Sequence, residues 1–213
     1  MSPDIKNSVD NTFILIFSIS VILLLIVTVT MITFVIKYNK KRHPVADKDI
    51  HGHTLLEILW TLIPTALALL MFFSGYSGFK LMRTVPKDSY VIKVTGRQWQ
   101  WNYEYPNGKK YDTLYVPDNQ PVKLELNSTD VNHSFYIPQL RIKEDVIPGR
   151  TNYLWFKTNE VGEYVVECAE YCGLSHAYML SKIISIPQQD FEKWVNYLPP
   201  ADTIKKDTTK IKN

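Results

Sequence analysis

The feature that most restricts how this chain folds is a charge-free apolar run near its N-terminus. Residues 13–36 consist of apolar side chains with scattered Ser and Thr. As a helix this run would measure about 36 Å at about 1.5 Å per residue, enough to cross a bilayer with some tilt. A second apolar run covers residues 55–79 and is interrupted by Glu57 and Pro64. Either run alone fits a buried core helix, but two in succession favour a transmembrane hairpin over residues 13–83.

The distribution of charge predicts how this hairpin is oriented. The connecting loop, residues 37–54, contains five basic side chains: Lys37, Lys40, Lys41, Arg42 and Lys48. The N-terminal tail, residues 1–12, has Lys6 as its one basic side chain. Loops rich in Lys and Arg stay in the cytoplasm. We therefore expect the N-terminal tail and everything after residue 83 on the outer side of the membrane.

Beyond residue 83 the composition changes to short β-type runs separated by turn residues. Repeated strands at this spacing predict a Greek-key sandwich or barrel, which we assign to residues 84–190. The remaining segment, residues 191–213, is expected to hold most of a short helix, over residues 188–197, and a disordered Lys-rich tail. The predicted strands cover residues 90–95, 98–105, 122–126, 132–137, 152–157, 164–167 and 181–186.

A cluster of soft ligands indicates the chemistry of the chain. Its two cysteines, Cys168 and Cys172, lie four residues apart and are followed by His176 and Met179. Thiolate, imidazole and thioether groups favour copper or iron over hard cations. His133 lies in a strand-like run farther back and is a candidate remote ligand.

Three simpler explanations of the cysteine pair account for less. A disulfide bond in an oxidising compartment would leave His176 and Met179 unexplained. A zinc site with two Cys and two His would need a different spacing, and Met is not a usual zinc ligand. A mononuclear blue-copper site uses one Cys, so the second cysteine of the pair would have no role in it. Two thiolates with two imidazoles instead suggest two copper ions that share both sulfurs.

The motif C-x-E-x-C-x-x-x-H-x-x-M, preceded by D-V-x-H-S-F-x-x-P-x-L, resembles the binuclear copper A site of cytochrome c oxidase subunit II. The resemblance extends from about residue 12 to about residue 190. It implies a membrane-anchored all-β fold, with a two-helix transmembrane hairpin followed by a cupredoxin-like Greek-key β-barrel. The copper ligands that it implies are Cys168 and Cys172 as bridges, His133 and Met179 on one ion, and His176 with the backbone carbonyl of Glu170 on the other.

The same resemblance implies a magnesium ion on the Glu170 side chain, shared with oxidase subunit I. It also assigns a role to the aromatic stretch of residues 96–105, which is similar to the family pattern G-x-Q-W-x-W-x-Y-E. There the first Trp receives electrons from the docked cytochrome, and in this chain that residue is Trp99. Gln100 stands where the family usually has Tyr. Alternation alone predicts that Trp99 shares one strand face with residues 101, 103 and 105.

Two further segments resemble the family. The pattern E-x-x-W-T-x-x-P beginning at Glu57 implies a carboxylate at the cytoplasmic mouth of a proton path into subunit I. From its position alone, Glu57 is equally well explained as an acidic group at a helix N-terminus. Residues 138–145 resemble P-x-L-x-x-K-x-D, with Arg141 in place of a common Gly. We interpret this stretch as a loop against subunit I.

These features imply the electron-receiving subunit of a terminal respiratory oxidase in a bacterial plasma membrane. It would take electrons from a cytochrome c and pass them to a haem of subunit I, where oxygen is reduced to water with proton pumping. Subunit III is a further expected partner, and no nucleic acid is expected. The donor is expected to be a separate protein, because the chain contains no C-x-x-C-H motif.

Three other kinds of protein agree less well with the sequence. A quinol oxidase subunit II has the hairpin and the β domain but lacks the copper ligands. A nitrous oxide reductase uses the same copper pair within a larger, histidine-rich enzyme without the hairpin. A copper-storage or chaperone module would not explain Glu57 or the aromatic stretch.

The chain departs from the family at the surface where the electron donor would dock. Glu104 and Asp130 match the acidic docking patch of the family, but Lys109 and Lys110 stand where relatives are acidic. This difference predicts a weakly charged or acidic donor, or one tethered in a larger complex.

Overall fold

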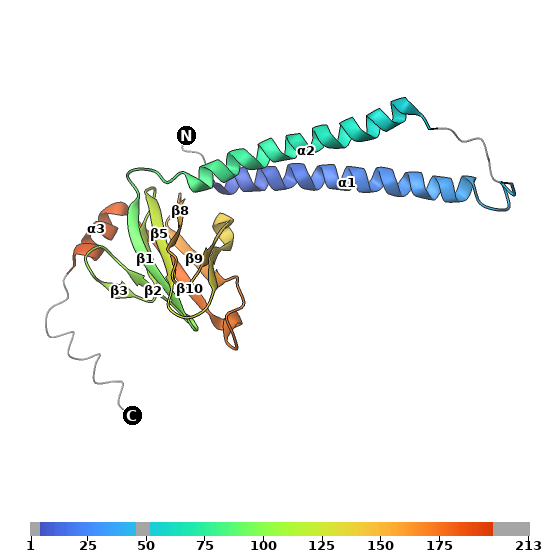
Figure 1. Cartoon of the computed structure of the whole chain (residues 1–213). Helices are drawn as coiled ribbons and strands as arrows, with labels where there is room; N and C mark the ends of the chain where they lie inside the picture. Colours follow the sequence, from blue (N-terminus) through green and yellow to red (C-terminus); the bar gives the residue numbers. More distant parts are fainter. Residues whose placement is uncertain (1–4, 46–51, 198–213) are drawn as a thin grey trace. The chain divides into compact units, whose positions relative to one another are not determined.

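The computed structural model describes residues 5–45 and 52–197, which form two compact units divided between Arg83 and Thr84 (Figure 1). The predicted disordered tail, residues 199–213, lies outside the described residues. So do His51 and the rest of the segment 46–51 in the predicted cytoplasmic loop.

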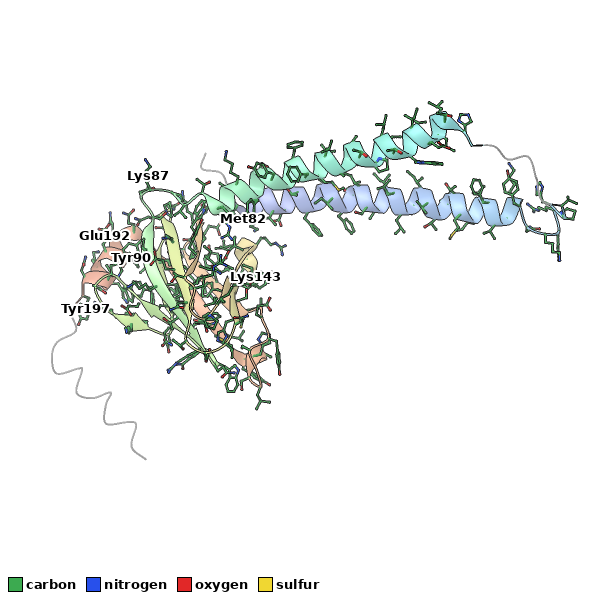
Figure 2. The ribbon with its side chains drawn as sticks, viewed as in Figure 1. Met82, Lys87, Tyr90, Lys143, Glu192 and Tyr197 are labelled. Carbon is green, nitrogen blue, oxygen red and sulfur yellow. The ribbon has the colours of Figure 1, made fainter. Side chains whose placement is uncertain are left out.

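The first unit is a helical hairpin formed by α1 (Ile5–Lys37) and α2 (Thr54–Arg83). Both helices are long and apolar enough to cross a membrane, and apolar side chains project along their whole length (Figure 2). Small residues let them approach: a Cβ on Gly78 would lie 2.8 Å from Ser8 Oγ. The predicted spans lie inside these helices, and α1 extends back to Ile5 into the segment predicted as a tail.

The second unit consists of two five-stranded sheets, in the orders β3-β2-β1-β5-β8 and β4-β10-β9-β6-β7. Most neighbouring strands are antiparallel, but β1 pairs with β5 and β4 pairs with β10 in parallel. The strands are β1 (Tyr90–Arg97), β2 (Gln100–Glu104), β3 (Lys110–Tyr111), β4 (Leu114–Pro117), β5 (Pro121–Ser128), β6 (His133–Ile137), β7 (Ile142–Val146), β8 (Asn152–Lys157), β9 (Gly162–Cys168) and β10 (Leu180–Ile186).

The core of this unit is built from alternating side chains. Ile92 and Val94 on β1 and Val122, Leu124 and Leu126 on β5 are buried, while the residues between them are more exposed. This period of two is the pattern of a sheet with one face in the core. The short helix α3 (Gln188–Asn196) follows β10 and buries Phe191 and Val195.

The aromatic stretch departs from its predicted alternation at one position. Trp101, Tyr103 and Tyr105 are buried, but Trp99 is 37% exposed. The physical reason is that β2 begins only at Gln100, so Trp99 belongs to the preceding turn and is not bound by the alternation of the strand.

The predicted loop of residues 138–145 was wrong in its second half. A 3-10 turn, η1 (Pro138–Leu140), leads directly into β7. Arg141 links them with a φ of 58°, in the left-handed region, which explains why a glycine suits this position.

Candidate metal centre

The candidate metal centre lies where β6 begins and β9 ends. The two strands pair so that Phe135 is opposite Cys168, and the backbone N–H of Ala169 donates to a β6 carbonyl at 3.0 Å. This register brings His133, at the start of β6, beside the end of β9. The chain then returns to β10 through the 3-10 turn η2 (His176–Tyr178). Strand pairing thus joins ligands that are far apart in the sequence.

Two buried thiols form the middle of the cluster. The Sγ atoms of Cys168 and Cys172 lie 3.8 Å apart, and both thiols are free. That separation excludes a disulfide bond, whose sulfurs lie about 2.05 Å apart. The Cys168 thiol donates to the backbone carbonyl of Glu170 at 3.3 Å, so a carbonyl oxygen also faces the sulfurs.

The imidazoles and the thioether surround these thiols. His133 Nδ1 lies 3.8 Å from Cys168 Sγ, and His176 Nδ1 lies 3.5 Å from Cys172 Sγ. Met179 Sδ lies 3.8 Å from Cys172 Sγ. His133 and Met179 are fully buried, while His176 is partly exposed. All six donor groups predicted from the sequence are therefore in one place.

The orientation of His133 is set by Asp130. Its Nε2 lies 2.9 Å from Asp130 Oδ1, which leaves Nδ1 facing the sulfur. Burial acts to raise the pKa of Asp130, but hydrogen bonds from the Gln98 backbone N–H, the His133 ring and the Val131 backbone N–H outweigh it and lower this pKa to about 2. A carboxylate behind an imidazole is typical of histidines that bind metals.

The donor set fits copper. Burial raises the pKa of the Cys172 thiol to about 12, and the adjacent Cys168 adds to the rise. Without metal the thiol is therefore protonated at neutral pH, and a metal must displace that proton because the thiolate is the ligand. Sulfur and imidazole donors together select copper-type ions, and the buried Met179 sulfur sets the cluster apart from an ordinary zinc site.

Two side chains from the turn before β2 contact the cysteine loop. Trp99 Nε1 donates to the carbonyl of Cys172 at 3.3 Å, and Gln98 Nε2 donates to the same carbonyl at 2.7 Å. The sequence did not predict Gln98 as a contact of the ligand loop, nor Asp130 as the partner of His133. Gln98 and Cys172 are 74 positions apart, so no local pattern reports their contact.

Comparison with known proteins gives the family. Residues 2–80 match the family described as "Cytochrome C oxidase subunit II, transmembrane domain", and residues 109–186 match "Cytochrome C oxidase subunit II, periplasmic domain". Together the two matches cover most of the 213 residues. The chain belongs to the cytochrome c oxidase subunit II family.

Proteins named cytochrome c oxidase subunit 2 are similar along most of this chain. The protein of Alkalihalophilus pseudofirmus is 36% identical over 192 residues, which cover 85% of this chain and 56% of that protein. The protein of Emericella nidulans is 32% identical over 201 residues, covering 82% and 80%. A protein of Rickettsia bellii with the name "Probable cytochrome c oxidase subunit 2" is 30% identical over 200 residues, covering 83% and 74%.

A solved structure agrees with the β unit. The periplasmic domain of subunit II of cytochrome oxidase from Bradyrhizobium japonicum is 35% identical, with a TM-score of 0.51, over 58% of this chain and 99% of that domain. With the family matches, this confirms the predicted fold class of two apolar helices followed by a cupredoxin-like β domain. As a member of the cytochrome c oxidase subunit II family with two such helices, the chain is membrane-anchored.

Two more of the predicted site groups are not among the six donors: Glu57 on α2 and the side chain of Glu170. Glu57 is in the first turn of α2 and lines an open hollow of about 300 Å³ with Thr54, Ile58, Thr61 and Leu62. The Glu170 carboxylate is half exposed, and its Oε1 lies 3.5 Å from Nζ of Lys143, which Figure 2 labels on β7.

Proposed function

We propose that this chain holds a binuclear copper centre with two bridging thiolates. The observation that carries the proposal is the convergence of four further donor groups on two buried sulfurs 3.8 Å apart. Their roles would be those that the family resemblance implies: Cys168 and Cys172 as bridges, His133 and Met179 on one ion, and His176 with the Glu170 carbonyl on the other.

The residues of the chain prepare this site for electron transfer. Asp130 holds the His133 ring with Nδ1 toward the sulfurs, and burial keeps water from the two thiols and Met179. When bound, the copper pair supplies a centre that takes up and releases one electron at a time, with the change in charge spread over two ions and two sulfurs. Buried sulfurs and a held imidazole suit electron relay better than substrate chemistry.

Trp99 is the residue through which we expect electrons to reach this centre. Its indole ring is 37% exposed at the surface, while its Nε1 donates to the carbonyl of Cys172. One side chain therefore links the solvent-facing side of the site to a residue that supplies a bridging sulfur.

In the cell the chain would be the electron-receiving subunit of cytochrome-c oxidase, an enzyme of the respiratory chain. It would accept electrons from a cytochrome c and pass them to a haem of subunit I, where oxygen is reduced to water with proton pumping. Membership of the family and the names of the relatives support this role. Subunit III is a further proposed partner. The proposed location is a bacterial plasma membrane. The basic residues after α1 support an orientation with the copper domain outside.

Two parts of the proposal concern protons and magnesium. Glu57 would stand at the cytoplasmic mouth of a proton path, as the family resemblance implies, and its place in the first turn of α2 agrees with that position. For magnesium, the Glu170 carboxylate is paired with Lys143, so this chain alone does not provide a fitting site. A magnesium ion would need further oxygen ligands from subunit I.

An electron paramagnetic resonance spectrum of the copper-loaded domain, residues 84–213, tests the proposal. This part is a compact unit, and the matching domain of the Bradyrhizobium protein has been crystallised alone. An electron shared by two copper nuclei gives seven hyperfine lines, and one nucleus gives four. We expect seven lines for the wild type and their loss in Cys172→Ser, whereas Met179→Leu should keep both ions because a thioether is the weakest ligand. Two shared-electron coppers in Cys172→Ser would contradict the bridging role.

A further inference from the structure

Gln98 contacts both loops that supply the proposed copper ligands. Its backbone N–H donates to Asp130 Oδ2 at 2.7 Å, and the other oxygen of that carboxylate lies 2.9 Å from His133 Nε2. Its side-chain Nε2 donates to the backbone carbonyl of Cys172 at 2.7 Å. A single residue therefore connects the segment that presents His133 to the loop that presents Cys172.

The carbonyl of Cys172 accepts two hydrogen bonds from neighbouring residues. Gln98 Nε2 is the closer donor at 2.7 Å, and Trp99 Nε1 follows at 3.3 Å. The backbone of Gly173 allows this approach, because it has a φ of +119° and a Cβ there would lie 3.1 Å from Gln98 Nε2 and 3.4 Å from Trp99 Cζ2. The glycine after the second cysteine thus leaves room for both donors.

The position of Gln98 argues against a role in packing. The residue is exposed and precedes β2 in a turn, so its side chain contributes little to the core. Its polar contacts are instead with a ligand-bearing residue and with the partner of a ligand. Groups that orient metal ligands from behind usually change metal affinity about 10- to 100-fold when they are removed.

We propose that Gln98 is a positioning residue of the copper centre, and this proposal rests on the function proposed above. By donating to the Cys172 carbonyl, the amide fixes the turn that carries the second bridging sulfur. It thereby also holds that carbonyl where the Trp99 indole can donate to it. Without the amide, the Cys172 turn would lose its shorter hydrogen bond and move relative to Cys168 and Trp99.

Two substitutions separate hydrogen bonding from size. Gln98→Leu keeps the approximate volume and removes the donor. Gln98→Glu keeps the shape but places a carboxylate, which accepts and does not donate, against the Cys172 carbonyl. Gln100→Leu is the matched control, because Gln100 lies two positions along the same segment and pairs with the Arg97 guanidinium instead of the ligand loop.

The first measurement needs no copper. In the metal-free domain of residues 84–213 labelled with ¹⁵N-tryptophan, the indole N–H resonance of Trp99 is assigned by its absence in Trp99→Phe. We expect this resonance to shift and its hydrogen exchange to quicken in both Gln98 variants, and to stay in place in Gln100→Leu. An unchanged resonance in both Gln98 variants would overturn the proposal.

The second measurement is the rate at which a copper chelator removes copper from the loaded domain. We expect removal to be about tenfold faster in Gln98→Leu, at least as fast in Gln98→Glu, and unchanged in Gln100→Leu. Removal at the wild-type rate in both Gln98 variants would overturn the proposal even if the Trp99 resonance moved, because the ligand loop would then be positioned without Gln98. If the wild-type domain formed no copper pair, the proposed function would fail instead, and the metal-free measurement would still decide whether Gln98 holds the loop.

Discussion

Gly96, on β1, shows how one missing side chain shapes the metal centre. A Cβ at this position would lie 3.0 Å from Trp101 Cζ3 and 3.3 Å from His133 Cδ2. The Trp101 and His133 rings meet edge to face, with centroids 5.9 Å apart. Both rings are buried, so neither can move freely into solvent. The glycine on β1 therefore leaves room for both the imidazole and the indole.

Gly96→Ala should displace His133 and strain the core. Overpacking of a buried site costs about 1–3 kcal/mol, so we expect the free energy of unfolding of the metal-free domain to fall by about that amount in urea titrations. The copper-loaded variant should also give an altered hyperfine pattern. Gly162→Ala is the control, because no atom lies within 4 Å of its Cβ position. Equal stability of the two variants would show that Trp101 and His133 relax without cost.

Single residues also mark how far the sequence predicts the site. The spacing of Cys168, Cys172, His176 and Met179 predicts a loop that binds a soft metal ion, because these four candidate ligands lie within twelve positions. The partners that orient them are less predictable. The contact from Gln98 to Cys172 depends on how a turn before β2 meets the β9–β10 loop, and this is decided by sheet packing rather than by local sequence.

Among the elements, the strands missed by the sequence share one property. β3, β4 and β7 are all edge strands of their sheets. β3 has two residues, and β7 places Lys143, Glu144 and Asp145 between its two buried apolar ends. Charges and short length protect sheet edges from pairing with other chains, but they also remove the alternation by which a strand is predicted. The interior strands, which must bury a face, were predictable.

The start of α2 carries the prediction on protons. Glu57→Gln should leave copper reduction by the donor intact and lower steady-state oxygen uptake of the assembled oxidase. Since positioned proton-transfer groups contribute about 10²-fold or more, we expect uptake below about a tenth of the wild-type rate. Glu57→Asp keeps a carboxylate beside the hollow and should recover part of it. The rates of copper reduction and of oxygen uptake are measured on the same preparation. Equal oxygen uptake in the wild type and Glu57→Gln would show that Glu57 acts only as an acidic group at the start of a helix.

At the scale of the whole molecule, the surface of the β unit combines exposed apolar groups with paired charges. Tyr171, Leu174 and Tyr178 are each at least 80% exposed. Two carboxylates of this unit are paired with lysines: Glu104 lies 3.1 Å from Lys110, and Glu163 lies 3.0 Å from Lys182. The Asp130 carboxylate is hydrogen-bonded to the Gln98 backbone N–H and to the His133 ring. The Lys109 ammonium donates to the backbone carbonyls of Val195 and Tyr197.

The nature of the donor stays a prediction: we expect it to be weakly charged or acidic, or tethered in a larger complex. Long-range charge mainly sets the association rate of electron-transfer partners. Where carboxylates are already paired with lysines, little net field remains to attract a basic protein. For the wild-type oxidase and its native donor, we therefore expect an association rate that changes little as ionic strength rises past 0.1 M, where the Debye length is about 10 Å.

Lys110→Gln tests this by exposing Glu104, which lies five positions from Trp99 or about 17 Å along an extended strand. Across that distance in water a unit charge attracts each lysine of a partner by about 0.24 kcal/mol. A test protein that presents two or three lysines to this surface should therefore associate about two- to threefold faster with the variant than with the wild type at low salt. This gain should vanish as salt is added. Lys193→Gln, which breaks the Lys193–Asp190 pair on α3, should give no gain. If the wild-type rate with the native donor already fell steeply with salt and Lys110→Gln raised it further, an acidic patch would dominate docking, contrary to this prediction.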